Sequence, residues 1–211
     1  MLELENKYYN KGYELIAGID EVGRGCLAGD VVACAIIMPK GLRIEGVKDS
    51  KKLSQKKREE LYQEILDAAL AVGIGSLGPE DIDRINIKQA TRFTMKFAVE
   101  NIRTRENKGL VPDILFIDAE EIDSDIEQVS IVKGDDKSHS IACASIVAKV
   151  YRDNMCKLWD QEYPGYNIKK HKGYGTKEHR ENIIELGPSK IHRMSFLKNI
   201  LKEIRKRQGH G

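Results

Sequence analysis

Four carboxylates stand out because each lies where an apolar segment stops. Asp20 ends the run ELIAGID and is followed by Glu21 and then by Val-Gly-Arg-Gly. Asp118 ends DILFID in the same way, and Asp135 follows Val-Lys-Gly just before a segment rich in small residues. If the strand ends are neighbours in one sheet, these acids converge at one edge of the core.

Clustered carboxylates repel one another, so their joint ionisation is disfavoured unless cations neutralise them. A ligand set made only of oxygen atoms selects Mg²⁺ or Mn²⁺. One acid at a strand end is more simply explained as a solvated turn residue. The repeated placement at apolar strand ends is what predicts a metal site.

The segments that must position these acids have either the periodicity of strands or that of helices. The strand-like runs are residues 14–20, 31–38, 71–76, 113–118 and, more weakly, 128–133. Two strands joined by a short loop, followed by alternating strands and helices, predict a mixed sheet with helices on its faces. The expected fold class is therefore α/β.

Residues 54–70 and 87–105 have the apolar periodicity of amphipathic helices. In the second segment, Phe93, Phe97 and Ile102 recur at helical spacing. We expect these three side chains to face the sheet.

A third helix is expected over residues 138–162. It carries a cluster of small side chains, Ala142, Cys143, Ala144, Ser145 and Ala148. Small side chains let a helix approach its neighbours closely, so we place this helix against the centre of the sheet.

Size and composition favour one ordinary domain, or one domain with an appendage, because 211 residues of which 41% are hydrophobic can bury a substantial core. No apolar run has the length of a signal peptide or a membrane span, so a soluble cytoplasmic protein is expected. The cysteines have no CxxC spacing and are expected to be buried free thiols: Cys26, Cys34, Cys143 and Cys156.

The net charge of +2 hides an asymmetry about Pro164. Residues 1–163 carry 23 basic and 29 acidic side chains, whereas residues 164–211 carry 12 and 4. A basic C-terminal quarter suits a polyanion such as nucleic acid. A solvated helix face with a disordered tail explains the charge equally well.

Gly23-Arg24-Gly25 with Gly29 resembles a loop that cradles phosphate, but it lacks the Lys-Ser/Thr of a P-loop. Nucleotide binding of that kind is not favoured. No GxSxG is present and no cysteine is framed as a nucleophile, so covalent catalysis is not expected either.

Three histidines, His171, His179 and His192, lie in the basic quarter without the spacing of a zinc site. We expect them to be surface or phosphate-contacting residues rather than metal ligands.

Several charged or glycine-bearing blocks occur in an order that resembles bacterial ribonuclease HII, the type 2 ribonuclease H. The blocks are IAGIDEVGRGCLAG, VKDSKKLS, FIDAEE, IVKGDDKSHSIACASIVAKVYRD and HKGYGTKEH. The resemblance runs from about Ile16 to Phe196. It implies a ribonuclease H-like catalytic core, here residues 1–163, continuous with a helical, basic C-terminal part, residues 164–211, that binds substrate.

The resemblance also implies the chemistry. Asp20, Glu21, Asp118 and Asp135 match the catalytic, metal-binding acids, which would hold two Mn²⁺ or Mg²⁺ ions when substrate is bound. The expected substrates are RNA–DNA hybrids and DNA duplexes with embedded ribonucleotides, cut on the 5′ side of the ribonucleotide to leave 3′-hydroxyl and 5′-phosphate ends. We expect a monomer with no membrane partner.

Substrate-binding residues follow by the same resemblance. Gly23, Arg24 and Gly25 match the motif whose backbone contacts the 2′-hydroxyl, and Tyr174 matches the tyrosine that senses the RNA-to-DNA junction. Further positions match residues that line or support the substrate groove: Lys51, Lys52, Ser145 and Lys149.

The chain departs from the family pattern at three positions. The family commonly has Pro where Cys26 and Asp30 stand, and Gly where Ala119 follows the third acid. The loop geometry around these residues is therefore open, although no expected catalytic group is lost.

Three rival functions remain. Ribonuclease HIII shares the acids but generally has an extra N-terminal domain, for which the residues before Asp20 leave no room. A non-catalytic nucleic-acid-binding domain is disfavoured because all four acids are present. An integrase or transposase of similar fold is disfavoured by the Gly-Arg-Gly and HKGY blocks.

Overall fold

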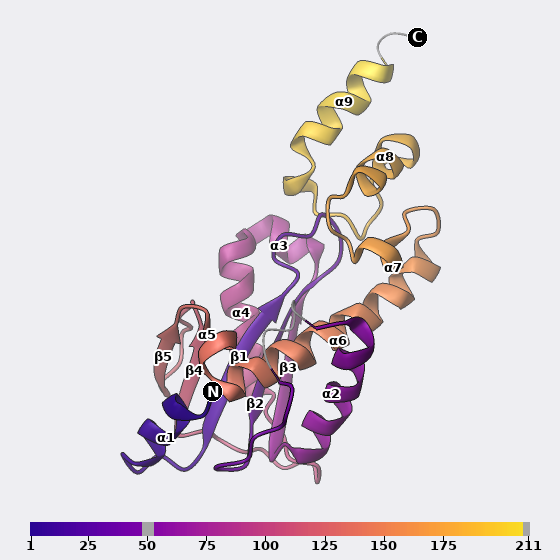
Figure 1. Cartoon of the computed structure of the whole chain (residues 1–211). Coiled ribbons are helices and arrows are strands. Elements are labelled where there is room, and N and C mark those ends of the chain that lie inside the picture. Colours follow the sequence, from indigo (N-terminus) through magenta and orange to yellow (C-terminus); the bar gives the residue numbers. More distant parts are fainter. Residues whose placement is uncertain (48–52, 209–211) are drawn as a thin grey trace.

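The computed structural model describes residues 1–47 and 53–208, and within them five strands form one mixed sheet in the order β3-β2-β1-β4-β5 (Figure 1). The strands are β1 (Ile16–Val22), β2 (Val31–Ile37), β3 (Ala71–Leu77), β4 (Ile114–Asp118) and β5 (Glu127–Ile131). β2 is antiparallel to both β1 and β3, whereas β4 is parallel to both β1 and β5. The predicted α/β fold class is confirmed.

Helices surround the sheet and extend beyond it (Figure 1). Their bounds are α1 (Glu3–Tyr9), α2 (Gln55–Ala68), α3 (Pro79–Ile85), α4 (Ile87–Glu100), α5 (Gly134–Lys137), α6 (His139–Glu162), α7 (Ile168–His171), α8 (Lys177–Leu186) and α9 (Lys198–Gln208), with a 3₁₀ turn at Met194–Phe196. In the described part of the chain, no helix has the length and apolar character needed to cross a membrane.

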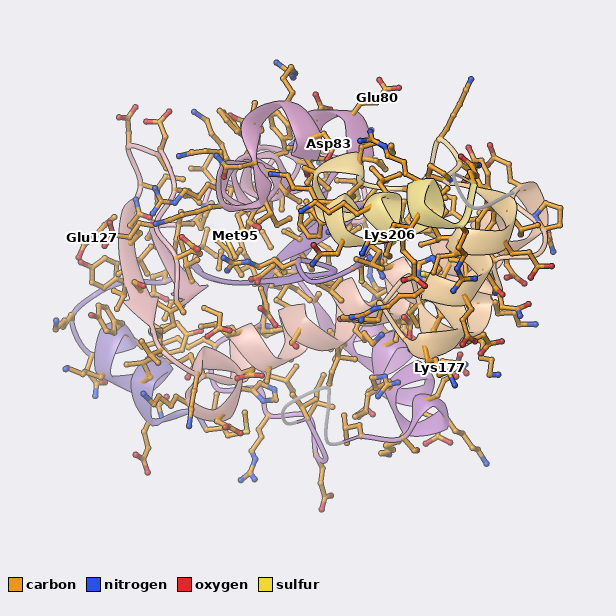
Figure 2. The ribbon with its side chains drawn as sticks, turned by 90° about the horizontal axis from the view of Figure 1, so that it is seen from above. Glu80, Asp83, Met95, Glu127, Lys177 and Lys206 are labelled. Atoms are coloured by element: carbon orange, nitrogen blue, oxygen red, sulfur yellow. The ribbon has the colours of Figure 1, made fainter. Side chains whose placement is uncertain are left out.

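Strand β2 divides its side chains between two cores, one on each face of the sheet. Cys34 and Ile36 pack toward α2 and α6, while Ala33, Ala35 and Ile37 pack toward α4. Every residue of β2 is buried, because the strand is covered on both faces. Seen from above, α3 and α4 lie on one side of the sheet and α6 on the other (Figure 2).

Helix α6 lies directly on β1, as its small residues predict. Ser138 caps the helix by accepting a hydrogen bond from the Ile141 N–H. On β1, Gly18 faces the start of the helix so closely that an added Cβ would lie 2.2 Å from the carbonyl carbon of Ser140. Helix backbone and strand backbone are therefore in contact at this point.

The prediction of which α4 side chains face the sheet is wrong. Phe93 and Phe97 are 44% and 38% exposed, and only Ile102, beyond the helix end, is buried as expected. The residues of α4 that are buried are Ala90, Thr91, Thr94, Met95 and Ala98.

Two glycines of β3 explain this rotation of α4. A Cβ on Gly73 or Gly75 would lie 2.0 Å from the carbonyl oxygen of Ala98 or Thr94, respectively. The helix backbone therefore rests on the bare strand, and this leaves no room for a phenyl ring between them.

The chain after α6 builds a third apolar cluster around its last turns. Tyr166, Ile168, Ile183 and Leu197 pack there against Cys156 of α6, and Ala28 from the loop after β1 joins them. A helical C-terminal part is thus present, and it shares its core with residues from the first half of the chain. In Figure 1, α9 projects from this part at the top of the view.

The cysteine prediction is confirmed within the described residues. Cys26, Cys34, Cys143 and Cys156 are all buried and unpaired. Burial raises the pKa of the Cys156 thiol to about 11, so this thiol is neutral at physiological pH.

We predict that Gly18→Ala destabilises the protein by about 1–3 kcal/mol, because the new methyl group must push α6 away from β1. Urea unfolding would measure the change. The matched control is Gly109→Ala, since Gly109 has nothing within 4 Å of an added Cβ and is not at positive φ. Equal stability of the two variants would contradict the close approach of α6 to β1.

Candidate active site

Asp20 and Asp118 lie at the same edge of the sheet. β1 and β4 are parallel neighbours, and Ile19 stands opposite Ile117 in their register. The next residue on each strand is an acid, so the two carboxylates follow at equivalent positions. The sequence-based expectation that these acids are neighbours is met by strand pairing.

Asp20 is a buried carboxylate, with 6% of its surface exposed. Burial raises its pKa well above the ordinary value, and the charges of Glu21 and Asp118 raise it further. Two hydrogen bonds oppose this shift: Oδ1 accepts from the Glu21 N–H at 2.7 Å, and the carboxylate is hydrogen-bonded to the Ser145 side chain on α6. A positive charge nearby would therefore favour the ionised form of Asp20.

Glu21 is the second acid on β1, and burial also raises its pKa. The Arg24 guanidinium opposes that shift from 3.6 Å, whereas Asp118 adds to it. The three acids Asp20, Glu21 and Asp118 are therefore close enough to influence one another's ionisation.

Asp135 lies in the short helix α5 and is buried. Its neighbour Gly134 donates its N–H to Oδ1 of Asp118 at 2.7 Å, so α5 begins against the end of β4. Lys133, just before this helix, adopts a left-handed φ of 56° that turns the chain into α5. The backbone that carries the fourth acid is thereby brought beside the third.

This donor set fits a hard divalent cation, because all of its ligand atoms are carboxylate oxygens and Asp20 is buried without a full counter-charge. Among the described residues, no three His, Cys, Asp or Glu side chains are already gathered as a ligand cluster. Asp20, Glu21 and Asp118 are linked by their charges, and Asp135 follows the Gly134 N–H that binds Asp118.

The Gly-Arg-Gly loop follows β1, and its two glycines serve different ends. Gly23 has φ +93°, and an added Cβ would lie 2.4 Å from Nε of Arg152. Gly25 is exposed and has nothing within 4 Å of an added Cβ. The first glycine is required by the fold, while the second leaves the backbone open to an incoming molecule.

Two buried arginines hold this loop, and sequence analysis missed both. Arg152 of α6 donates to the carbonyls of Asp30, Ala28 and Lys172 at 2.8, 3.0 and 2.7 Å. Arg193 donates to the carbonyls of Gly29 and Arg24, both at 2.9 Å. The sequence signal that could have indicated a buried role for Arg152 was a charged residue inside the small-residue helix. The sequence carries no such signal for Arg193.

Tyr174 is joined to the same loop. It forms an antiparallel bridge with Cys26, and the Leu27 N–H donates to the Gly173 carbonyl at 2.8 Å. The Tyr174 side chain is 41% exposed. The HKGY block and the Gly-Arg-Gly loop, almost 150 residues apart in sequence, thus form one surface.

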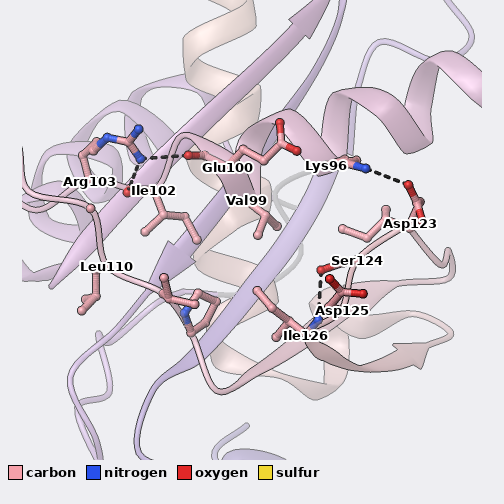
Figure 3. Close-up of a pocket in the computed structure, with 14 residues that line it drawn as sticks. Lys96, Val99, Glu100, Ile102, Arg103, Leu110, Asp123, Ser124, Asp125 and Ile126 are labelled. Atoms are coloured by element: carbon pink, nitrogen blue, oxygen red, sulfur yellow. Dashed lines mark hydrogen bonds and ion pairs between the residues drawn. The ribbon is translucent and has the colours of Figure 1, made fainter.

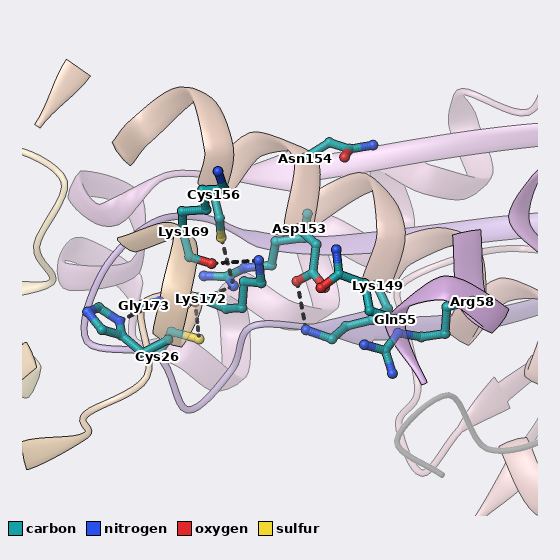
Figure 4. A network of polar contacts seen from close by, with 12 residues as sticks. Cys26, Gln55, Arg58, Lys149, Asp153, Asn154, Cys156, Lys169, Lys172 and Gly173 are labelled. Atoms are coloured by element: carbon teal, nitrogen blue, oxygen red, sulfur yellow. Dashed lines mark hydrogen bonds and ion pairs between the residues drawn. The ribbon is translucent and has the colours of Figure 1, made fainter. Parts of the chain in front are cut away.

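The remaining expected substrate-binding residues fall in different places. Ser145 lies at Asp20, and Lys149, one turn further along α6, forms a 2.7 Å ion pair with Asp153 (Figure 4). Lys51 and Lys52 lie outside the described residues.

The three departures from the family pattern are accommodated locally. Cys26 is buried and its thiol lies 3.4 Å from the Lys172 carbonyl (Figure 4), while Asp30 accepts a 2.6 Å hydrogen bond from Ser76. Ala119 has a left-handed φ of 51°, a conformation that glycine adopts with less strain.

Glu120 is a further buried acid that sequence analysis did not single out. Its carboxylate lies 3.3 Å from Arg24 and 3.1 Å from Arg92 of α4, so it forms two ion pairs. Arg24 in turn reaches Glu21. The Arg24 side chain is therefore held between two glutamates at the edge of the acid group.

A cavity of about 420 Å³ lies elsewhere, between α4 and the segments that flank β4 (Figure 3). Its walls include Val99, Ile102, Leu110 and Ile126, with Lys96 and Asp123 paired at one side. None of the four acids lines it. The chemistry of the acids therefore belongs to an open edge of the sheet and not to this cavity.

Comparison with known proteins identifies the family. The family described as Ribonuclease HII matches residues 17–199. The chain belongs to the ribonuclease HII family. It is accordingly a ribonuclease H, an endoribonuclease of RNA–DNA hybrids, from a family of metal-dependent enzymes.

Individual relatives agree with this family assignment. The chain is 58% identical to ribonuclease HII of Alkaliphilus metalliredigens over 201 residues, which cover 95% of this chain and 98% of that protein. The structure of ribonuclease H2 from Pyrococcus horikoshii has a TM-score of 0.74 at 24% identity. The match covers 91% of this chain and 99% of that chain.

The structure of Bst-RNase HIII in complex with Mn²⁺ has a TM-score of 0.66 at 16% identity. The match covers 91% of this chain and 70% of that chain. The likeness shows a shared fold.

We predict that Asp20→Asn stabilises the metal-free protein, because the amide removes a buried carboxylate and its repulsion with Glu21 and Asp118. The melting temperature should rise by about 2–4 °C for each kcal/mol relieved. Adding Mn²⁺ should raise the melting temperature of the original protein and leave that of the variant nearly unchanged. A metal-induced shift of the same size in both would contradict the placement of a cation at Asp20.

Proposed function

We propose that this protein hydrolyses the RNA strand of hybrids and cuts on the 5′ side of ribonucleotides embedded in duplex DNA, leaving 3′-hydroxyl and 5′-phosphate ends. The observation that carries the proposal is the buried Asp20 carboxylate beside Glu21 and Asp118, at the sheet edge from which the Gly-Arg-Gly loop leaves β1. Metal chemistry and ribose recognition then share one surface.

The acids would hold two Mg²⁺ or Mn²⁺ ions once substrate is present. Bound cations would supply water activation and stabilisation of the leaving 3′-oxygen. Asp20 would help to hold them, because its residue is the more buried of the strand-end pair and the charges of both Glu21 and Asp118 act on its carboxylate. Ser145 would keep the Asp20 carboxylate oriented through its hydrogen bond.

Selection for RNA would come from the loop surface. The 2′-hydroxyl is the group that distinguishes a ribonucleotide at a given site, and it can both donate and accept hydrogen bonds. The backbone of residues 23–25 is presented beside the acids, with Gly25 open to solvent. Arg152 and Arg193 hold the loop from behind by its carbonyls.

The basic C-terminal part, residues 164–211, would bind duplex phosphates. Lys177 and Lys206 both lie in this part (Figure 2), and the last turn of α9 carries Arg205, Lys206 and Arg207. Phosphate contacts give affinity without sequence preference and weaken as salt rises. One chain supplies all of the proposed site, so we propose that the monomer is active.

We predict that a labelled DNA duplex with one ribonucleotide is cut on the 5′ side of that ribonucleotide with Mn²⁺ or Mg²⁺ and is not cut with EDTA. Asp20→Asn should lower the rate at least about 100-fold, because an amide lacks the charge that holds the cations. An all-DNA duplex serves as the control. Binding without cutting under every metal condition would favour a non-catalytic role, and cutting of the all-DNA duplex would favour an integrase-like activity.

We predict that Tyr174→Ala lowers cutting at a single embedded ribonucleotide about 5- to 50-fold more than on a long hybrid, because a hybrid offers many registers and a single junction offers one. Steady-state kinetics on both substrates would measure the ratio. The matched control is Tyr151→Ala, a tyrosine of similar exposure at 38% against 41%. Equal losses on the two substrates in Tyr174→Ala would contradict junction sensing.

A further inference from the structure

Three histidines of the C-terminal part form a buried cluster behind Tyr174, so their predicted surface position is wrong. His171, His179 and His192 are at most 8% exposed. The rings of His171 and His179 stack with centroids 4.1 Å apart, and the Nε2 atoms of His179 and His192 lie 3.2 Å apart. Burial of three imidazoles requires that each find hydrogen-bond partners.

The partners of His192 determine which of its nitrogens carries the proton. The Ser189 N–H donates to Nδ1 of His192 at 3.0 Å, so Nδ1 is an acceptor. In a neutral imidazole the other nitrogen is then the donor. Nε2 of His192 therefore donates to Nε2 of His179.

His179 continues the chain of hydrogen bonds. Because its Nε2 accepts from His192, its proton lies on Nδ1, which donates to the Tyr174 carbonyl at 2.9 Å. The hydrogen bonds thus run in one direction, from the Ser189 N–H through two imidazoles to the backbone of Tyr174.

His171 holds the neighbouring peptide in a parallel way. Its Nδ1 accepts from the Gly173 N–H at 3.2 Å, and its Nε2 donates to the Tyr166 carbonyl at 2.7 Å. Gly173 has a left-handed φ of 82° and an added Cβ would lie 2.5 Å from the Ala28 carbonyl oxygen. The turn that presents Tyr174 is therefore fixed on both sides.

The histidine cluster is suited to neutral rings and not to a metal ion. Every ring nitrogen of the three histidines already has a hydrogen-bond partner, so none has a lone pair to spare. Burial lowers the pKa of His179 and of His192 to about 4, and it also lowers that of His171. The rings are neutral at pH 7, as the one-way chain requires.

We propose that His192, His179 and His171 are positioning residues that hold Tyr174 against the Gly-Arg-Gly loop and so set selectivity for single ribonucleotides. This inference rests on the proposed function of Tyr174. It assigns a specificity role to side chains that do not touch substrate, because they act through the Tyr174 carbonyl and the Gly173 N–H.

Two variants of similar size separate the hydrogen bond from the packing. In His192→Gln, the side-chain amide can still donate near the former Nε2 position, whereas His192→Leu cannot donate at all. The readout is kcat/KM at a single embedded ribonucleotide divided by kcat/KM on a long hybrid. We expect His192→Leu to lower this ratio on the order of 5-fold or more and His192→Gln to retain most of it.

A double-mutant cycle tests whether the effect passes through Tyr174. In a Tyr174→Ala background, His192→Leu should leave the ratio unchanged. An equal loss on both substrates, or the same drop in ratio with and without Tyr174, would overturn the positioning role.

The protonation pattern can be tested on the unaltered protein, whatever the variants do to folding. Nitrogen-15 NMR of labelled histidines at pH 7 should show His192 protonated at Nε2 alone and His179 at Nδ1 alone. The opposite tautomers, or a cationic ring, would overturn the inference.

Failure of the proposed function gives a different result. If the unaltered enzyme does not cut at a single ribonucleotide, the proposed function fails and the selectivity role fails with it. If it does cut there and His192→Leu leaves the ratio unchanged, only the positioning role fails.

Discussion

The contact between α6 and β1 is the constraint on which the site depends. At Gly18 the strand has no side chain, so the 24-residue helix lies directly on it. A helix of that length is about 36 Å long. It therefore connects the sheet core with the C-terminal part of the chain as one rigid element.

The acid site, the Gly-Arg-Gly loop and the C-terminal part each contact a residue of this helix. Ser145 reaches Asp20, Arg152 binds the carbonyls of the Gly-Arg-Gly loop, and Cys156 packs in the C-terminal cluster. A shift of α6 relative to β1 would disturb acids, loop and C-terminal part together. This is why one glycine in a central strand matters to residues far from it.

Charged side chains gather in two regions along this helix. In the first region, burial and then the charges of neighbouring acids raise the pKa of Asp20 and Glu21 at the end of β1, which costs stability in the absence of cations. In the second region, Arg152 and Arg193 are fully buried and bind carbonyl groups. Glu120 and Arg24 lie between the two regions and form ion pairs at their border.

Much of the fold follows from local sequence patterns. The five strands and the helices at residues 54–70 and 138–162 were predictable because alternation, apolar runs and caps are local properties of the chain. The strand-end acids were equally visible, and strand pairing placed Asp20 beside Asp118. The motif blocks identified the family, whose model matches residues 17–199.

Tertiary structure decided which side chains face inward. Phe93 and Phe97 are at helical spacing, yet α4 turns Thr94 and Ala98 to the sheet because Gly73 and Gly75 bring the backbones together. The histidines of a basic segment are buried because their partners are backbone groups brought together by folding. Arg193 binds a loop more than 160 residues away. Sequence periodicity shows only the repeat within one helix or strand. Whether a side chain is buried depends on the room left by the segment that packs against it, and distant segments come together only when the chain folds.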